Sequence, residues 1–185
     1  MKKITIAIVL LCTVLTACGN GQASEKECDK CGSNAVVDAI MNRRSIRKYK
    51  DTAVEKEILE QIALCGINAP NAVNAQNWAV RISTDRDFIN SIRGTYNPPA
   101  LIFVAGQSGV DCGLMGENMM LAAHSLGLGT CCLGGPARAI KADADMLARL
   151  DLPQGMELQF LISVGYPDEQ PDAKPRKKEV IKFLE

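Results

Sequence analysis

The sequence predicts an α+β domain in which helices cover a central sheet. Three observations lead to this prediction. Some segments repeat apolar residues at helical spacing, others are short apolar runs typical of buried strands, and the two kinds are mixed along the chain. The length of 185 residues corresponds to about one domain.

Four segments have the pattern of helices, and these are residues 34–42, 54–65, 113–126 and 144–150. Asn34 is a favoured N-cap for the first. Gly66 and Gly127 are expected to end the second and third. The third is apolar nearly all round, which predicts burial on every side. A second copy of the chain is one way to cover it, and a central helix within a monomer is the other.

Three segments have the pattern of strands. Residues 78–83 alternate between apolar and polar side chains, whereas residues 101–105 and 158–164 are apolar runs typical of buried strands. Residues 127–135 are rich in glycine and are interpreted as a bend that lets the backbone approach a ligand closely.

The composition excludes several classes of function. The 21 basic and 21 acidic residues give a net charge of zero, which argues against nucleic-acid binding. With 47% apolar and 23% charged residues, the chain is neither a disordered tail nor a membrane bundle. The aromatic content of 4% argues against a platform for base stacking.

The N-terminus has the features of an export signal. Two lysines precede an apolar run over residues 4–15, shorter than the roughly twenty residues that span a bilayer. The following Leu15-Thr16-Ala17-Cys18-Gly19 resembles the lipobox of bacterial lipoproteins. This resemblance implies cleavage before Cys18 and a diacylglyceryl group on its sulfur. The alternative is an ordinary signal peptide that contains a cysteine.

The predicted organisation is therefore a signal peptide at 1–17, a lipidated Cys18 and flexible tether over 18–33, and one domain over 34–185. The expected location is the bacterial cell envelope, with the exported protein held by a lipid anchor. It would face the periplasm or lie at the cell surface.

Eight cysteines occur, at positions 12, 18, 28, 31, 65, 112, 131 and 132. Cys28 and Cys31 form a C-x-x-C in the tether, where a disulfide, a redox pair and part of a zinc site are the alternatives. No metal site is predicted, because Cys131 and Cys132 are adjacent rather than spaced and the chain has one histidine.

Two basic clusters indicate an anion-binding site. Arg43-Arg44-Ser45-Ile46-Arg47 places three guanidiniums and a hydroxyl within five residues, and Lys174-Pro175-Arg176-Lys177-Lys178 lies near the C-terminus. Guanidinium groups match phosphate oxygens in bidentate fashion. Two clusters on a neutral chain favour one localised anion, and the alternative is two solvated surface runs.

The segment 69–78 carries four amides, those of Asn71, Asn74, Gln76 and Asn77. Amides donate and accept hydrogen bonds, so they suit a heteroaromatic ligand with alternating N–H and C=O edges. Asparagine is also a common turn residue, so the alternative is a structural loop.

Together these motifs resemble those of the nitroreductase family, which are FMN-dependent oxidoreductases. The resemblance rests on four segments in order, which are Arg43-Arg44-Ser45-Ile46-Arg47-Lys48-Tyr49, residues 69–78, residues 118–129, and Gly165-Tyr166-Pro167 followed by Lys174-Pro175-Arg176. It implies a nitroreductase-like α+β fold with a mostly antiparallel sheet and a long buried central helix at a homodimer interface, where FMN binds.

The resemblance also implies roles for particular residues. Arg43, Ser45, Lys174 and Arg176 would hold the FMN phosphate, Arg47 would face the N1/O2 edge of the isoalloxazine, and Arg44 would make backbone or ring-edge contacts. Pro70, Asn71, Asn74 and Gln76 would reach the flavin from the partner subunit. The backbone of Cys132, Leu133, Gly134 and Gly135 would lie near N5.

The implied activity is the reduction of nitroaromatics, quinones or similar conjugated acceptors in two alternating half-reactions. The flavin carries the chemistry, so no catalytic side chain is expected. NAD(P)H is the donor that the family resemblance implies. The alternatives are a flavin- or ligand-binding lipoprotein without turnover, and a thiol-linked electron carrier that uses Cys28 and Cys31.

Overall fold

The computed structural model describes residues 34–184, and the predicted signal peptide, Cys18 and the tether with Cys28 and Cys31 lie outside them. Within this range the strands form one sheet in the order β1-β2-β4-β3, and every neighbouring pair is antiparallel. The strands are β1 (Trp78–Ser83), β2 (Ala100–Gly106), β3 (Gly129–Leu133) and β4 (Glu157–Gly165). The predicted α+β class with an antiparallel sheet is confirmed.

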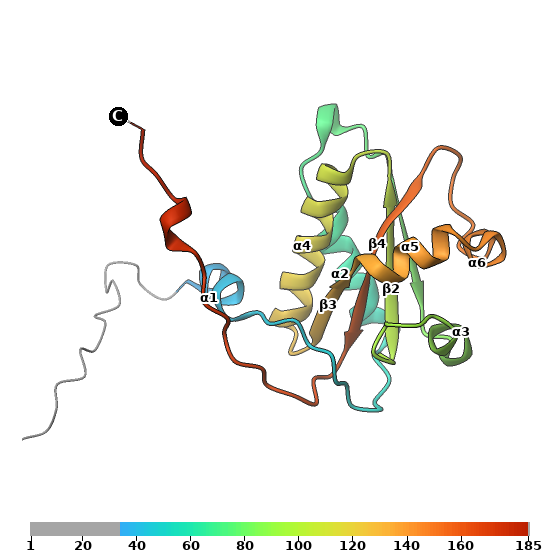
Figure 1. Ribbon diagram of the computed structural model, residues 1–185, viewed down its shortest axis with the longest axis horizontal. Helices are drawn as coiled ribbons and strands as arrows, with labels where there is room; N and C mark the ends of the chain where they lie inside the picture. Colours follow the sequence, from blue (N-terminus) through green and yellow to red (C-terminus); the bar gives the residue numbers. More distant parts are fainter. Residues whose placement is uncertain (1–33, 185) are drawn as a thin grey trace, which may run out of the picture. The chain divides into compact units, whose positions relative to one another are not determined.

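Helices cover both faces of this sheet (Figure 1). They are α1 (Ala35–Asn42), α2 (Lys56–Ile67), α3 (Arg86–Ser91), α4 (Gly109–Ser125), α5 (Gly134–Lys141) and α6 (Ala144–Ala148), with short 3₁₀ turns at Ala72–Asn74 and Lys178–Val180. Side chains of β2 alternate between the two faces. Ile102 and Val104 pack in the cluster with α2 and α4, whereas Phe103 packs in the cluster with α3 and α5.

The helix predicted over residues 54–65 continues through Gly66 to Ile67, so its predicted end is wrong by two residues. Gly66 is buried where α2 meets α4, and a Cβ at this position would collide with the side chain of Met119. The glycine is there because the two helices approach each other closely, not because the helix ends.

The predicted bend at 127–135 is also wrong. Residues 129–133 form the edge strand β3, paired with β4, and Gly134 and Gly135 begin α5. Glycine is unfavourable in strands and helices on local grounds alone, so the pattern indicated a loop. Pairing with β4 and packing of α5 on the sheet override that preference.

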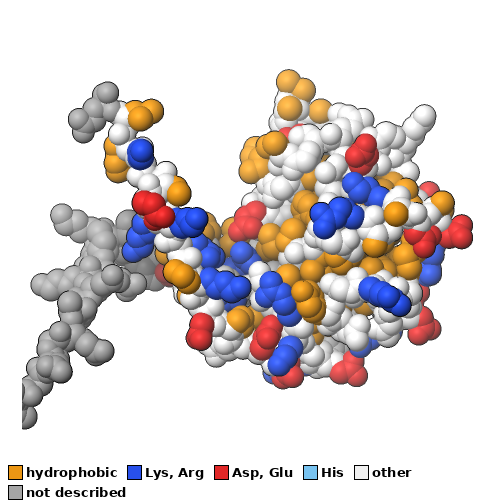
Figure 2. Space-filling view, in the orientation of Figure 1, with side chains coloured by type: hydrophobic (Ala, Val, Ile, Leu, Met, Phe, Trp, Pro, Cys, Tyr) orange, Lys and Arg blue, Asp and Glu red, His pale blue; other side chains and the backbone are white. Residues whose placement is uncertain are grey.

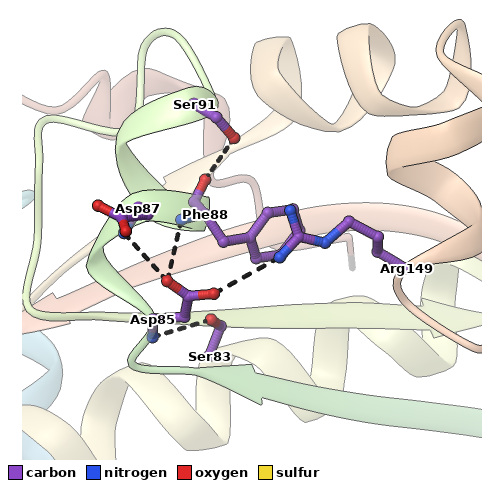
Figure 3. A network of polar contacts seen from close by, with 6 residues as sticks. All are labelled: Ser83, Asp85, Asp87, Phe88, Ser91 and Arg149. Carbon is purple, nitrogen blue, oxygen red and sulfur yellow. Dashed lines mark hydrogen bonds and ion pairs between the residues drawn. The ribbon is translucent and has the colours of Figure 1, made fainter.

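The short helix α3 was not predicted. It buries Phe88 and Ile89 in the core, and Figure 3 shows the polar contacts that surround it. The Asp85 carboxylate accepts hydrogen bonds from the backbone N–H groups of Asp87 and Phe88 at 3.0 and 3.1 Å, as expected of an N-cap. The Arg149 guanidinium lies 3.5 Å from the same carboxylate and 4.0 Å from the centroid of the Phe88 ring. Together these contacts join α3 to the end of α6.

The long helix α4 is buried on one side only within a single chain, so the chain alone does not provide the central position within a monomer, and the predicted cover by a second copy stays a prediction. Met115 and Met119 are fully buried against the sheet, whereas Val110 is 73% exposed and Leu114 is 43% exposed. The apolar residues of α1 are likewise exposed, with Val36 at 64% and Met41 at 68%. These apolar faces have no covering element within the described chain.

Among residues 34–184, no helix combines the length and the apolar content needed to cross a membrane.

Candidate functional site

The basic segment after α1 lies along the sheet edge formed by β3. The backbone N–H of Ile46 donates to the carbonyl of Thr130 at 2.9 Å, and Ser45 forms an isolated bridge with Thr130. A Cβ on Gly129 would approach three atoms of Ile46 to 2.6–2.9 Å. A residue without a side chain is therefore required at position 129 for the segment to lie this close.

Tyr49, at the C-terminal end of this basic segment, holds the segment against β4 through hydrogen bonds of its hydroxyl. Its hydroxyl lies 2.7 Å from Oγ of the buried Ser163 and donates to the carbonyl of Ile46 at 2.5 Å. Burial raises the pKa of Tyr49, so the phenol stays neutral and keeps its proton as a donor. The backbone on both sides of Arg47 is thus held against the sheet.

The two basic clusters predicted from the sequence meet in one small cavity of about 120 Å³, which we call the basic cavity. Its lining is Arg43, Arg44, Ser45, Arg47, Pro171, Asp172, Lys174 and Arg176. Cationic side chains outnumber the single carboxylate in this lining, so the cavity favours an anion. Figure 2 shows Lys and Arg side chains gathered where the segment after α1 and the C-terminal segment lie.

The cations of this cavity differ in how they are held. Nε of Arg43 is buried and has no hydrogen-bond partner among the described residues, although Glu117 lies 3.7 Å away. Arg44 donates to the carbonyls of Met41 and Arg43 at 2.8 and 2.9 Å, so it completes the C-terminal end of α1. Arg43 is therefore better placed than Arg44 to bind an anion directly.

A second cavity of about 490 Å³ adjoins the first and shares Arg43, Arg44 and Pro171 with it. His124, Thr130 and Glu169 are among the residues that line it. The Thr130 hydroxyl is buried and lacks a hydrogen-bond partner among the described residues. Burial, followed by the charges of Arg43 and Arg44, lowers the pKa of His124.

Arg47 lies at the other side of the basic cavity, between two neighbours. Its backbone N–H donates to the Glu169 carboxylate, and its guanidinium lies 5.8 Å from the centroid of the Tyr96 ring. The Tyr96 side chain is the largest contribution that raises the pKa of Arg47. It therefore favours the charged form of the guanidinium, which arginine side chains already keep at physiological pH.

The residues expected near flavin N5 lie at the junction of β3 and α5. Cys131 is buried with the α5 cluster and Cys132 is exposed, because adjacent strand residues point to opposite faces. Burial raises the pKa of Cys131, which keeps this thiol protonated and unreactive. Gly134 and Gly135 are exposed in the first turn of α5, which has no side-chain cap.

In the amide loop, Pro70, Asn74 and Gln76 are exposed and Asn71 is partly buried, and none of them lines the basic cavity of the same chain. Next to it, the Asn77 carbonyl accepts a hydrogen bond from Gln107, two residues before α4 begins. His124, beside Arg43 and Arg44, lies in the last turn of α4. The 17 residues of α4 extend over roughly 25 Å, too far for one side chain to bridge. One chain alone does not bring the two sets of predicted residues together.

The described residues include no group of three or more His, Cys, Asp or Glu side chains arranged to hold a metal ion.

Comparison with known proteins assigns the family. A family model described as "Putative TM nitroreductase" matches residues 35–185. The chain belongs to the nitroreductase family. A protein of Methanothermobacter thermautotrophicus named "Putative NADH dehydrogenase/NAD(P)H nitroreductase" is 31% identical over 159 residues, which cover 75% of this nitroreductase-family chain and 81% of the relative.

Solved structures of nitroreductases have the same fold. A Desulfovibrio desulfuricans structure described as a "putative nitroreductase in complex with FMN" has a TM-score of 0.72 and 27% identity, and the match covers 83% of this chain and 98% of that one. A Desulfitobacterium hafniense nitroreductase with bound FMN has a TM-score of 0.77 over 83% of this chain and all of that one. At 22% identity, the second likeness shows the fold alone.

Sequence reasoning missed three residues of this nitroreductase site, namely Tyr96, Thr130 and Glu169. Thr130 belongs to the segment interpreted as a bend, so that interpretation did not place it on a strand beside Ser45. Glu169 follows the Gly165-Tyr166-Pro167 motif and is separated from Arg47 by more than a hundred residues. Nothing in the local sequence around Tyr96 indicates its contact with Arg47.

Proposed function

We propose that this nitroreductase-family protein binds FMN at the basic cavity and is an FMN-dependent oxidoreductase. The observation that carries the proposal is the meeting of Arg43, Arg47 and Arg176, from opposite ends of the domain, in one cavity. Nε of Arg43 makes no hydrogen bond and is paired only loosely, at 3.7 Å, with the Glu117 carboxylate, so a phosphate oxygen could take up this donor. The cavity of about 120 Å³ suits a phosphate group rather than a whole nucleotide.

Each predicted residue has a role that its position permits. Arg43, Ser45, Lys174 and Arg176 bind the phosphate, and Arg44 positions Arg43 by completing α1. Arg47 faces the N1/O2 edge of the isoalloxazine, where a positive charge favours the reduced, anionic form. The first-turn N–H groups of Gly134 and Gly135 are free to approach N5, as helix N-termini commonly do for acceptors.

The proposed reaction has two alternating half-reactions. When bound, FMN supplies the hydride chemistry at N5, which no side chain of the protein can provide. The donor proposed from the relatives' names is NAD(P)H. Nitroaromatics, quinones and similar conjugated electrophiles are the proposed acceptors, and they would enter after the oxidised donor leaves.

The working unit is proposed to be a homodimer. The exposed apolar faces of α1 and α4 supply the surface, and Val110 and Leu114 lie on the α4 face. Asn71, Asn74 and Gln76 are too far from the basic cavity of their own chain, so a second copy would supply them. Leu114→Glu should convert the dimer to monomers in sedimentation experiments and weaken FMN binding. Glu57→Gln, a change at an exposed position on α2, is the control.

We further propose that the protein is exported and held at the cell envelope by a lipid on Cys18. The motif around Cys18 supports this proposal. NAD(P)H, the donor proposed from the relatives' names, is a cytoplasmic molecule. Export would therefore replace it with another reductant, such as a membrane quinol or a protein thiol, and NAD(P)H remains the proposed donor only for a protein kept in the cytoplasm. Cys18→Ser should move the protein out of the membrane fraction, whereas Cys12→Ser should not. Equal membrane retention in both variants would contradict the anchor.

The deciding experiment is the visible spectrum of the protein purified without residues 1–18. We expect a yellow protein with bound FMN that is bleached by a reductant and restored by a nitroaromatic. A colourless protein that does not take up added FMN would refute the proposal. Bound flavin that no acceptor reoxidises would instead indicate a binding protein without turnover.

Removal of the phosphate contacts tests the site itself. Arg43→Ala with Arg176→Ala removes two charge-assisted hydrogen-bonding groups, each worth about 1.5–3 kcal/mol. FMN affinity should therefore fall by about a hundredfold or more. Lys141→Ala, at an exposed position on α5, is the matched loss of one positive charge and should leave the affinity unchanged.

A further inference from the structure

The loop between α3 and β2 is firmly anchored. Thr95 is 1% exposed, and its hydroxyl donates to the carbonyl of Ile92 at 3.1 Å. Further along, the Arg86 guanidinium donates to the carbonyl of Pro98 at 2.9 Å. The segment between these anchors is thus held in one position, although its surface is open to solvent.

Within this loop, two consecutive residues have left-handed backbone conformations. Tyr96 has a φ of 66° and Asn97 a φ of 47°. Neither is glycine, so both conformations are energetically unfavourable, and they are most so for the bulky tyrosine. Residues kept in such conformations are concentrated at functional sites. Glycine would adopt the backbone conformation at position 96 without strain. We therefore expect the tyrosine side chain to make a contact that glycine could not make.

That contact is with Arg47. The Arg47 guanidinium lies 5.8 Å from the centroid of the Tyr96 ring, within the range of cation–π interactions. The guanidinium also donates a long hydrogen bond, 3.3 Å, to the carbonyl of Ser45. Tyr96 is 45% exposed, so little of its ring is used in the protein core.

The same loop also approaches the junction at which the flavin ring is proposed to lie. A Cβ on Gly94 would be 3.6 Å from Cγ of Pro136, in the first turn of α5. The loop therefore passes close to the first turn of α5, which contains Gly134 and Gly135, and its Tyr96 ring lies beside the guanidinium of Arg47. Tyr96 is placed to limit where that guanidinium can go.

We propose that Tyr96 is a positioning residue that directs the Arg47 guanidinium toward the pyrimidine edge of the flavin, and so favours binding of the reduced over the oxidised cofactor. This inference rests on the proposed function, because it requires FMN in the site. Without Tyr96, we expect the guanidinium to turn away from that edge, toward the Glu169 carboxylate that already attracts its charge.

The test compares two glycine substitutions in full-length protein. Tyr96→Gly and Asn97→Gly relieve the same kind of backbone strain, so both proteins should unfold at or above the wild-type temperature. Only Tyr96→Gly removes the ring beside Arg47. It should lower the ratio of the affinities for reduced and oxidised FMN about tenfold. The midpoint potential of the bound flavin should therefore fall by about 30 mV, the value for a two-electron couple. Tyr96→Phe, which keeps the ring, should give a smaller change.

Arg47→Ala shows whether Tyr96 acts through Arg47. In that background, Tyr96→Gly should cause no further change in the midpoint potential. An equal change with and without Arg47 would mean that Tyr96 acts on the flavin directly, and it would overturn the proposal. Equal potentials for Tyr96→Gly and Asn97→Gly would overturn it as well.

A readout without FMN separates this inference from the proposed function. In NMR spectra of the apoprotein, the Arg47 Nε–H should show a ring-current shift that is lost in Tyr96→Gly and kept in Asn97→Gly. Absence of that shift in the wild type would refute the contact while leaving FMN binding intact. A shift together with no FMN binding would refute the proposed function and the role of Tyr96 in it.

Discussion

Gly129→Ala is expected to distort the basic cavity, although neither Gly129 nor the residue it would collide with, Ile46, lines that cavity. The new Cβ would lie 2.6, 2.7 and 2.9 Å from Cγ1, Cβ and Cγ2 of Ile46. Ordinary contacts between carbon atoms are about 3.5–4.0 Å, so the segment with Arg43 and Arg47 has to move by about 1 Å. Rotation of the Ile46 side chain is insufficient, because Cβ is itself one of the clashing atoms.

The size of the effect follows from overpacking and from a strained hydrogen bond. Overpacking costs about 1–3 kcal/mol, and the 2.9 Å bond from Ile46 to the Thr130 carbonyl stretches as the segment moves. We expect a loss of about 2 kcal/mol, which lowers the unfolding temperature by roughly 4–8 °C in a domain of this size. FMN affinity should fall about tenfold or more, the equivalent of one charge-assisted hydrogen bond.

Thermal unfolding of the apoprotein and FMN titration measure the two effects separately. Gly113→Ala is the matched control for thermal unfolding, because a Cβ at position 113 would have no atom of the same chain within 4 Å and alanine is the better helix former. Glu57→Gln, at an exposed position on α2, is the control for FMN titration, because position 113 lies on the α4 face proposed to pack in the dimer. Adding Ile46→Ala removes two of the three clashing atoms, so the double variant should be less destabilised than the sum of the single variants. Strict additivity, or wild-type FMN affinity in Gly129→Ala, would refute the reasoning.

Two further predictions concern stability. Asp85→Ala should cost about 1 kcal/mol through loss of the α3 N-cap, as measured by denaturant unfolding, with FMN affinity unchanged because α3 does not line the basic cavity. His124 has a lowered pKa in the folded apoprotein, so the unfolded chain takes up the proton first as the pH falls. Its contribution to stability is full above the unfolded value of 6.5 and declines as the pH falls toward the lower folded value. His124→Gln should reduce this part of the pH dependence in unfolding curves recorded between pH 8 and pH 5, a range chosen to bracket histidine titration at about 6.5.

Most elements were predictable because their apolar pattern is local. The alternation in residues 78–83 and the apolar runs at 101–105 and 158–164 correspond to β1, β2 and β4. Apart from the short helix α3, which was missed, the errors in the elements involve glycine. Gly66 and Gly129 are required by side chains distant in the sequence, Met119 and Ile46 respectively, and a local pattern carries no information about such neighbours.

The convergence of the basic clusters was predictable, because a neutral chain with two such clusters suggested one anion. The structure brings Arg43 and Arg176 to the same cavity. Their assignment to FMN phosphate stays a prediction. The roles of Tyr96 and Glu169 beside Arg47 could not have been read from spacing, since both depend on how separate loops meet at one side chain.

The proposed homodimer would link activity to assembly. The basic cavity and the amide loop lie at opposite ends of α4, and the outer face of α4 between them is apolar and uncovered in a single chain. An antiparallel partner packed on that face would bring its amide loop to the basic cavity, and the same contact would bury Leu114. Under this arrangement, a change that disrupts the apolar dimer contact would also remove the partner's amides from the flavin site. An isolated subunit retains the cations for the phosphate but lacks the amides proposed to bind the ring.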